Sequence, residues 1–84
     1  MKNDYITFRS VTFAQKAERS LKRAGMDCFL QRTPKELSKR GCGYCLKLRP
    51  GLAMRAKQRL DAEGMEYGKF YGVRADGGFE EIHL

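Results

Sequence analysis

The chain has 84 residues, a length that accommodates one compact core and excludes a second domain of ordinary size. Its composition, 42% hydrophobic and 32% charged, excludes a disordered or low-complexity chain. The formal net charge of +7 favours anionic partners without naming one. Apolar runs are short and the N-terminal residues lack the apolar core of a signal peptide. We therefore expect a single cytoplasmic domain over residues 1–84, with no membrane partner.

An internal duplication organises the chain. Shifting the sequence by 39 positions, so that Tyr5 falls on Tyr44, also aligns Ala14 with Ala53, Ala17 with Ala56, Leu21 with Leu60, Gly25 with Gly64 and Met26 with Met65. Each copy contains a β-prone run, a helical run that ends at glycine, and a second β-prone run. The pattern predicts two consecutive β-α-β units.

The first copy begins with a strand over Tyr5–Arg9, where apolar residues alternate. Ser10 is a suitable N-cap for the helix that follows from Phe13 to Ala24, and Gly25 supplies the residue that closes it. The chain then resumes as a strand over Met26–Gln31.

The segment from Thr33 to Gly43 joins the copies. Thr33 and Glu36 have the spacing of a capping box, and Pro34 stands at the first helical position. A short helical turn is therefore expected here. Lys39 and Arg40 would lie at its C-terminal end.

The second copy predicts a strand over Tyr44–Leu48, a helix from Leu52 to Leu60 that stops at Gly64, and a last strand over about Glu66–Val73. Two such units give a β-α-β-β-α-β order. This order predicts an α+β, ferredoxin-like two-layer sandwich with an antiparallel sheet and both helices on one face. Residues 74–84 form a C-terminal hairpin extension, in which Asp76-Gly77-Gly78 makes the turn into an added edge strand.

The strand after the joining segment fixes the direction of Cys45. If Tyr44, Leu46 and Leu48 face the helices, Cys45 and Lys47 face away from them. The opposite register would bury Lys47 without a partner, at a cost of several kcal/mol. We therefore expect Cys45 on the open face of the sheet.

Metal and redox sites are alternatives for Cys42 and Cys45. A zinc site needs four ligands, and the remaining candidates are His83 and Cys28, which we assign to the core. A soft-metal carrier of this fold would place its Cys-x-x-Cys after the first strand, where the sequence reads RSVT. A thioredoxin-like pair would open a helix, whereas this pair leads into a strand. We expect no metal site, and His83 as a solvent-facing residue.

A nucleophilic or carrier thiol is the remaining reactive chemistry for Cys42. Lys39 and Arg40 supply positive charge, and Gly41 and Gly43 expose backbone N–H groups; both features favour a thiolate. The same groups would stabilise a persulfide or selenopersulfide on Cys42. An inert cysteine in a turn is the alternative from the residues alone.

Nucleic-acid binding is the alternative of a different class. RGCGYCLKL resembles the third strand of RNA-recognition domains, but Cys42 and Thr7 stand where stacking aromatics are expected. That motif would also turn Tyr44 onto the open face. Weak binding of single strands remains open, through aromatic residues that would line this face: Tyr5, Phe29 and Tyr67 or Tyr71. The ordinary role of such residues is a dimer interface, so a homodimer is also expected.

The chain resembles the selenium/sulfur carrier-like family of small bacterial domains, over approximately Tyr5–Tyr71. The matching residues are Ala24-Gly25, Thr33-Pro34-Lys35-Glu36-Leu37-Ser38, Cys42-Gly43, Leu46 and Gly64-Met65-Glu66-Tyr67. The resemblance implies a non-catalytic carrier without a bound cofactor, which receives sulfur or selenium on Cys42 from a cysteine desulfurase-type donor and passes it to an acceptor enzyme. Cys45 and the tail after Val73 depart from the family pattern, and Cys45 is a candidate resolving thiol.

Overall fold

The computed structural model describes residues 2–38 and 43–84. Its elements follow in the order β1 (Asp4–Phe8), α1 (Val11–Arg23), β2 (Cys28–Arg32), α2 (Lys35–Ser38), β3 (Tyr44–Leu48), α3 (Ala53–Ala62), β4 (Phe70–Val73) and β5 (Phe79–Ile82). The expected helical turn after Pro34 and the expected edge strand of the tail are both confirmed, as α2 and β5.

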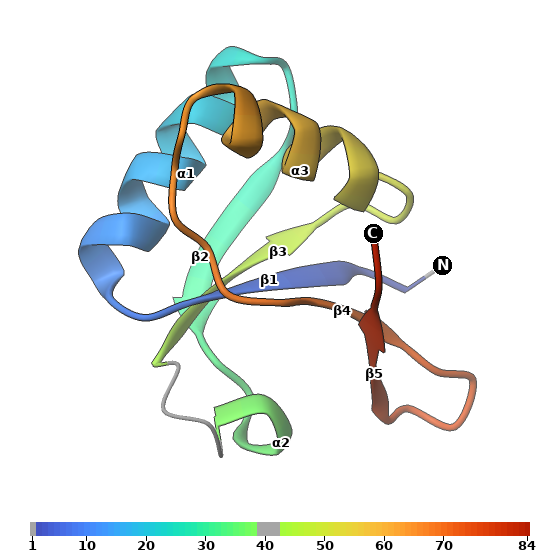
Figure 1. The fold of residues 1–84 in the computed structure, drawn as a ribbon. Coiled ribbons are helices and arrows are strands. Elements are labelled where there is room, and N and C mark those ends of the chain that lie inside the picture. Colours follow the sequence, from blue (N-terminus) through green and yellow to red (C-terminus); the bar gives the residue numbers. More distant parts are fainter. Residues whose placement is uncertain (1, 39–42) are drawn as a thin grey trace.

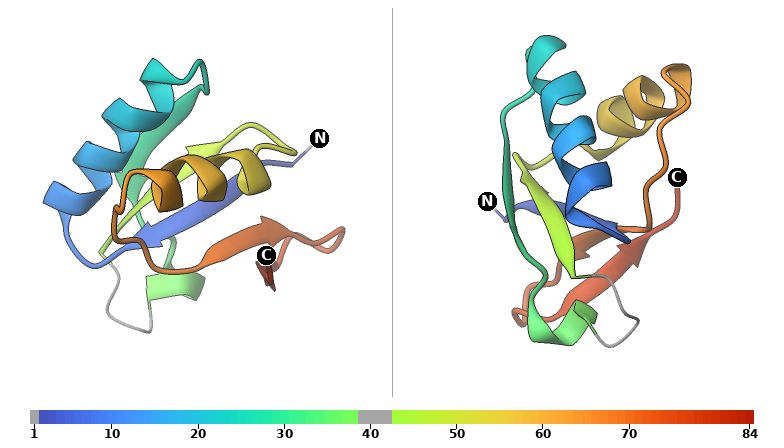
Figure 2. Two further views of the ribbon diagram at one scale, coloured as in Figure 1. Left: turned by 45° about the horizontal axis from the view of Figure 1, so that its top comes forward. Right: turned by 90° about the vertical axis from the view of Figure 1, so that its left-hand side faces the viewer.

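The strands form one antiparallel sheet in the order β2-β3-β1-β4-β5. Helices α1 and α3 cover one face of this sheet, while α2 lies on the other side (Figures 1 and 2). The protein is thus a small α+β domain in which the two long helices share one face. We call the face away from α1 and α3 the open face.

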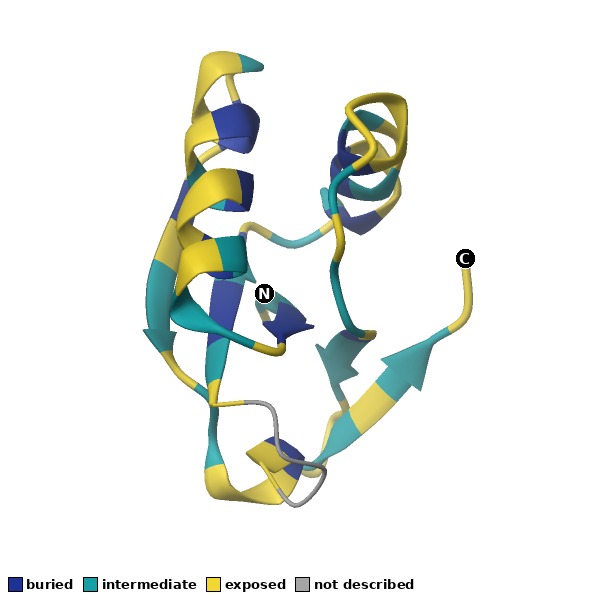
Figure 3. Ribbon diagram, turned by 60° about the vertical axis from the view of Figure 1, so that its left-hand side comes forward, coloured by how far each residue is buried: buried dark blue, intermediate teal, exposed yellow. Residues whose placement is uncertain are grey.

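The core lies between the sheet and the two long helices. Ile6, Phe8, Leu21 and Leu60 are fully buried there, and the buried positions of both helices face inward in Figure 3. The other buried positions of α1 and α3 include four alanines, which permit close approach of the helices to the sheet: Ala14, Ala17, Ala53 and Ala56.

The predicted helix ends follow from local chemistry. The Ser10 hydroxyl accepts a hydrogen bond from the Phe13 N–H at 3.3 Å, which confirms the predicted cap of α1. Gly25 and Gly64 adopt φ values of 80° and 65° after α1 and α3, a conformation that residues with a Cβ rarely adopt. The duplicated glycines therefore serve the same function in both halves.

The strand register confirms the predicted direction of Cys45. Leu46 pairs with Ile6, a core residue of β1, whereas Cys45 pairs with Thr7. Because directly paired residues project to the same face, Cys45 and Lys47 lie on the open face. Tyr44 packs against the core, so the register required by an RNA-recognition motif is absent.

Two local expectations were wrong. The last strand begins at Phe70 and not near Glu66, because Gly68 and Lys69 bond to the backbone and hydroxyl of Thr7 in place of a regular ladder. In addition, Thr33 Oγ1 is buried without a hydrogen-bond partner in the described chain, so it does not cap α2.

Of Tyr67 and Tyr71, the two alternatives for the open face, Tyr71 lies there, directly opposite Tyr5, and Tyr67 does not. Its ring packs edge-to-face against Phe70 next to the core, and its hydroxyl donates to Asp61 of α3. Tyr67 therefore belongs to the helix side and not to the open face.

None of the helices in the described part of the chain has the length and apolar character needed to cross a membrane.

Candidate functional site

The joining segment is held at its two ends. The Thr33 N–H donates to the Gly43 carbonyl at 3.2 Å, one position beyond the pairing of Arg32 with Tyr44 in the β2-β3 ladder. The hydrogen bond therefore brings Thr33, two residues before α2, against the residue that follows Cys42. The predicted site residues Lys39, Arg40, Gly41 and Cys42 lie outside the described residues.

Gly43 is the one predicted loop residue that the structure describes. It is exposed, and a Cβ placed on it would meet no described atom within 4 Å. Its φ is not among the positive values. The position thus tolerates a side chain sterically, and a glycine here leaves the approach to the adjacent backbone open.

Cys45 is buried although it lies on the open face. Its side chain has no exposed area, and its Sγ lies 4.0 Å from the Arg32 carbonyl. Burial raises the pKa of the Cys45 thiol to about 11, and the neighbouring side chains of Thr33 and Gln31 oppose this shift only in part. Cys45 is therefore a neutral thiol at physiological pH.

Cys28 is buried on the opposite face of the sheet. It belongs to the core, as predicted, with 1% of its surface exposed. Burial, followed by the negative charge of Glu18, raises the pKa of its thiol to about 11. The two described cysteines are thus both poor sources of thiolate.

The positions of Cys28, Cys45 and His83 argue against a zinc site that combines them. Cys28 projects into the core and Cys45 onto the open face, so the sheet separates these two zinc candidates. The third, His83, directly follows β5; 83% of its side chain is exposed, and its Nδ1 lies 3.7 Å from Glu81 Oε2. Within residues 2–38 and 43–84, no group of three or more His, Cys, Asp and Glu side chains could hold a metal ion.

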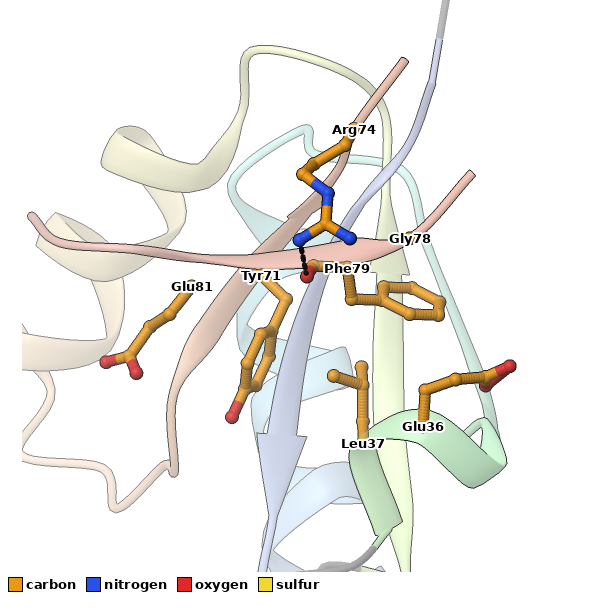
Figure 4. Close-up of a pocket in the computed structure, with 7 residues that line it drawn as sticks. All are labelled: Glu36, Leu37, Tyr71, Arg74, Gly78, Phe79 and Glu81. Atoms are coloured by element: carbon orange, nitrogen blue, oxygen red, sulfur yellow. Dashed lines mark hydrogen bonds between the residues drawn. The ribbon is translucent and has the colours of Figure 1, made fainter. Parts of the chain in front are cut away.

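A pocket on the open face was missed by the sequence analysis. It has a volume of about 520 Å³ and lies between α2 and the β4-β5 hairpin (Figure 4). Its lining residues are Glu36, Leu37, Tyr71, Arg74, Gly78, Phe79 and Glu81. The alternation of residues 79–84 indicated which of them share a face, but nothing local to the sequence places α2 opposite the hairpin.

The fold and the joining segment define a small α+β domain with a cysteine-bearing segment between two β-α-β units. A family model described as "Putative Se/S carrier protein-like" matches residues 3–72. The chain belongs to this family. No curated protein and no solved structure matched the chain.

Proposed function

We propose that the protein is a sulfur or selenium carrier that holds the chalcogen on Cys42 as a persulfide or selenopersulfide. Family membership over residues 3–72 is the observation that carries the proposal. A cysteine desulfurase-type enzyme donates the chalcogen and a separate enzyme accepts it. The protein itself catalyses no turnover.

We also infer that the fold is of the ferredoxin-like class. The support is the part of the sheet ordered β2-β3-β1-β4, together with α1 and α3 on one face. On this interpretation, α2 is an insertion between the two units, and β5 is an addition to the sheet edge. Cys42 then stands in the connection between the two halves.

The pKa values of the other thiols support the choice of Cys42. A thiol with a pKa of about 11, such as Cys28 or Cys45, is ionised to roughly one part in ten thousand at pH 7. Chalcogen exchange requires a thiolate, so these two buried thiols react slowly in the folded protein. In this proposal, the positive charges of Lys39 and Arg40 stabilise the thiolate of Cys42.

The transfer is a thiolate exchange that requires no external oxidant. The Cys42 thiolate attacks the terminal sulfur of the donor's persulfide, an S–S bond forms to Cys42, and the donor's cysteine leaves as a thiolate. The acceptor then attacks the same terminal sulfur and releases Cys42. As a resolving thiol, Cys45 would attack Cys42 Sγ and expel hydrosulfide; its burial requires a local opening first.

Intact-mass measurement after incubation with a cysteine desulfurase and cysteine tests the proposal. We expect an adduct of the mass of one sulfur atom that a reductant removes. It should be lost in Cys42→Ser and retained in the matched variants Cys28→Ser and Cys45→Ser. An adduct that persists in Cys42→Ser, or that never forms, would reject the assignment.

The RNA-recognition motif no longer supports nucleic-acid binding, because Tyr44 faces the core and not the open face. Phe29 remains 60% exposed on the open face, with Lys47 Nζ 5.8 Å from the centre of its ring. An exposed aromatic residue beside one cation is common to many kinds of interface. We therefore keep a single proposed function.

A further inference from the structure

Basic side chains gather on the two long helices, whose exposed positions point away from the core (Figure 3). On α1, Lys16, Arg19 and Arg23 are exposed and follow one another at intervals of three and four residues, so they project from one face of the helix. On α3, Arg55 and Arg59 are four residues apart and share a face in the same way. We call these five residues the basic patch.

Contacts between the helices show that the two faces adjoin. Arg59 Nε donates to the Ser20 hydroxyl of α1 at 3.0 Å. The hydrogen bond from Ser20, followed by the charges of Arg59 and Arg23, lowers the pKa of Glu63, the residue that follows α3. Lys16 lines one pocket together with Glu63. Cations of both helices therefore lie around one carboxylate at the junction of α1 and α3.

The carboxylates near the basic patch leave most of its charge uncancelled. Glu63 lies within the patch and pairs with Arg59 at 3.3 Å. The other carboxylates on the two helices and beside their ends are engaged with other groups: Glu18 with Lys22, Asp61 with Lys57, Glu66 with Arg9, Asp27 with Arg49, and Asp4 with the Gly51 N–H.

Four cations of the basic patch have no ion-pair partner in the described chain. Lys16, Arg19, Arg23 and Arg55 form no ion pair within residues 2–38 and 43–84. The residues outside these ranges have no carboxylate side chain that could neutralise the patch, since they are Met1, Lys39, Arg40, Gly41 and Cys42. The patch therefore selects an anionic ligand.

The composition of the patch favours phosphate groups over an acidic protein surface. Protein interfaces centre on aromatic and apolar residues, and charged residues are depleted there. The exposed large hydrophobic residues of the described chain are Phe29, Met54 and Leu84, of which only Met54 belongs to a helix. Because Met54 directly precedes Arg55, it projects about 100° away from it around the helix axis. The patch thus lacks the apolar anchor that a protein partner would bury.

The spacing of the cations suits a duplex backbone. Lys16 and Arg23 are about 10 Å apart along the axis of α1, and packed helices lie about 8–10 Å from each other. A stretch of duplex of about 10 Å presents about three phosphates on each strand. Single-strand binding adds aromatic residues on which bases stack, whereas the exposed aromatic Phe29 lies on the open face.

We infer that the basic patch binds the phosphate backbone of a double-stranded nucleic acid, irrespective of base sequence. This surface is not the one on which an RNA-recognition motif would hold its bases, which is the open face. Helix α2 lies on the other side of the sheet (Figure 2), so a duplex on α1 and α3 leaves α2 uncovered. Duplex binding and chalcogen transfer therefore use different surfaces.

Fluorescence anisotropy with a labelled duplex of about 16 base pairs tests this inference over a range of salt concentrations. If four phosphates are neutralised, the logarithm of the binding constant should fall with that of the salt concentration at a slope of about −3 to −4. RNA and DNA duplexes should bind alike, since both present phosphates. A blocked decaglutamate peptide should compete about tenfold more weakly than unlabelled duplex, because its charges are about twice as far apart.

Two double variants of equal net charge separate the basic patch from the general charge of the chain. Lys16→Gln/Arg55→Gln removes two cations of the patch, whereas Lys35→Gln/Lys47→Gln removes one from α2 and one from the open face. The first should bind the duplex roughly tenfold more weakly or worse at 50 mM salt, with a slope shallower by about 2. The second should keep the wild-type slope to within about 0.5.

Equal losses in the two double variants would show that net charge alone carries the binding and would overturn the inference. Competition by decaglutamate as strong as that of the duplex, or a preference of more than about tenfold between RNA and DNA, would overturn it as well. In the ¹⁵N-labelled wild-type chain, the duplex should shift the amides of Lys16, Arg23 and Arg55. Shifts confined to Phe29 and Lys47 would contradict the assigned surface.

Discussion

The Thr33 N–H and the Gly43 carbonyl meet at 3.2 Å and close the segment that contains α2 and Cys42. Gly43 therefore holds its position through its backbone, and a Cβ there meets no described atom within 4 Å. We predict that Gly43→Ala leaves the free energy of unfolding within about 0.5 kcal/mol of wild type, as for most exposed substitutions. Sulfur uptake by Cys42 should fall, because the methyl group obstructs the approach of a partner's thiol.

Urea unfolding and the initial rate of adduct formation measure the two effects separately. Ala75→Gly, an exposed change in the β4-β5 hairpin, is a control that should leave uptake unchanged. A Gly43→Ala chain that is folded and takes up sulfur at the wild-type rate would show that this glycine has no role in access.

Gly68 is the opposite case, because a Cβ there would meet both the side chain and the backbone of Thr7. A Cβ there would lie 2.5 Å from Thr7 Oγ1 and 2.8 Å from the Thr7 carbonyl oxygen. Thr7 is held in the centre of the sheet, so neither atom can move far. Gly68→Ala should lower the free energy of unfolding by about 1–3 kcal/mol, the usual cost of overpacking. A urea midpoint equal to that of Gly43→Ala would contradict this contact.

Cys45 and the start of β4 show which features of the fold could be predicted from the sequence. The direction of Cys45 was predictable, since burial of Lys47 decides the register of β3 and both residues share its face. The late start of β4 was not, because it depends on the contact of Gly68 with Thr7, which are far apart in sequence. Local sequence patterns predict the periodicity of an element and the ends of helices. They do not predict contacts between segments that are distant in the sequence.

Some features of the candidate site were predictable from the sequence and others were not. The residues that follow Pro34 predicted α2, but the burial of Cys45 depends on what packs over the open face. An outward residue in a two-layer domain is expected to meet solvent. The Thr33 side chain, which the capping-box pattern assigned to the helix, lies instead beside the Cys45 thiol. The residues proposed for reactivity, Lys39 to Cys42, stay a prediction from sequence.

Ser20 links the two long helices through a buried hydroxyl. It donates to Glu63 Oε1 and accepts from Arg59 Nε at 3.0 Å, while Arg59 and Glu63 also form an ion pair. Ser20 itself is fully buried. Ser20→Ala should reduce the free energy of unfolding by about 1–2 kcal/mol, because two hydrogen bonds are lost inside the helix layer.

Thermal or urea unfolding checks this value. Ser38→Ala is the matched control, since that exposed hydroxyl donates to the Lys35 carbonyl within α2 and should matter little to global stability. Equal effects of the two substitutions would show that the Ser20 network adds nothing to the packing of α1 on α3.

The two buried thiols predict a loss of stability in alkali. Burial raises the pKa of Cys28 and of Cys45 from 9.0 to about 11. Each neutral thiol therefore stabilises the folded state fully below pH 9, and this contribution is lost as the pH rises towards 11, because the unfolded chain ionises first. The loss at pH 10 should be about 1.4 kcal/mol for each thiol.

Urea unfolding at pH 7.5 and at pH 10 measures this loss. Cys45→Ala leaves a small cavity and lowers stability at both pH values, so the informative quantity is the difference between them. That difference should shrink by about 1.4 kcal/mol in Cys45→Ala and by the same amount in Cys28→Ala. Burial and, to a smaller extent, the charge of the Cys45 thiolate raise the pKa of Tyr5, so its contribution cancels in Cys28→Ala but only in part in Cys45→Ala. An unchanged difference in Cys45→Ala would mean that this thiol meets solvent, and Cys45 would then compete with Cys42 as the acceptor of the chalcogen.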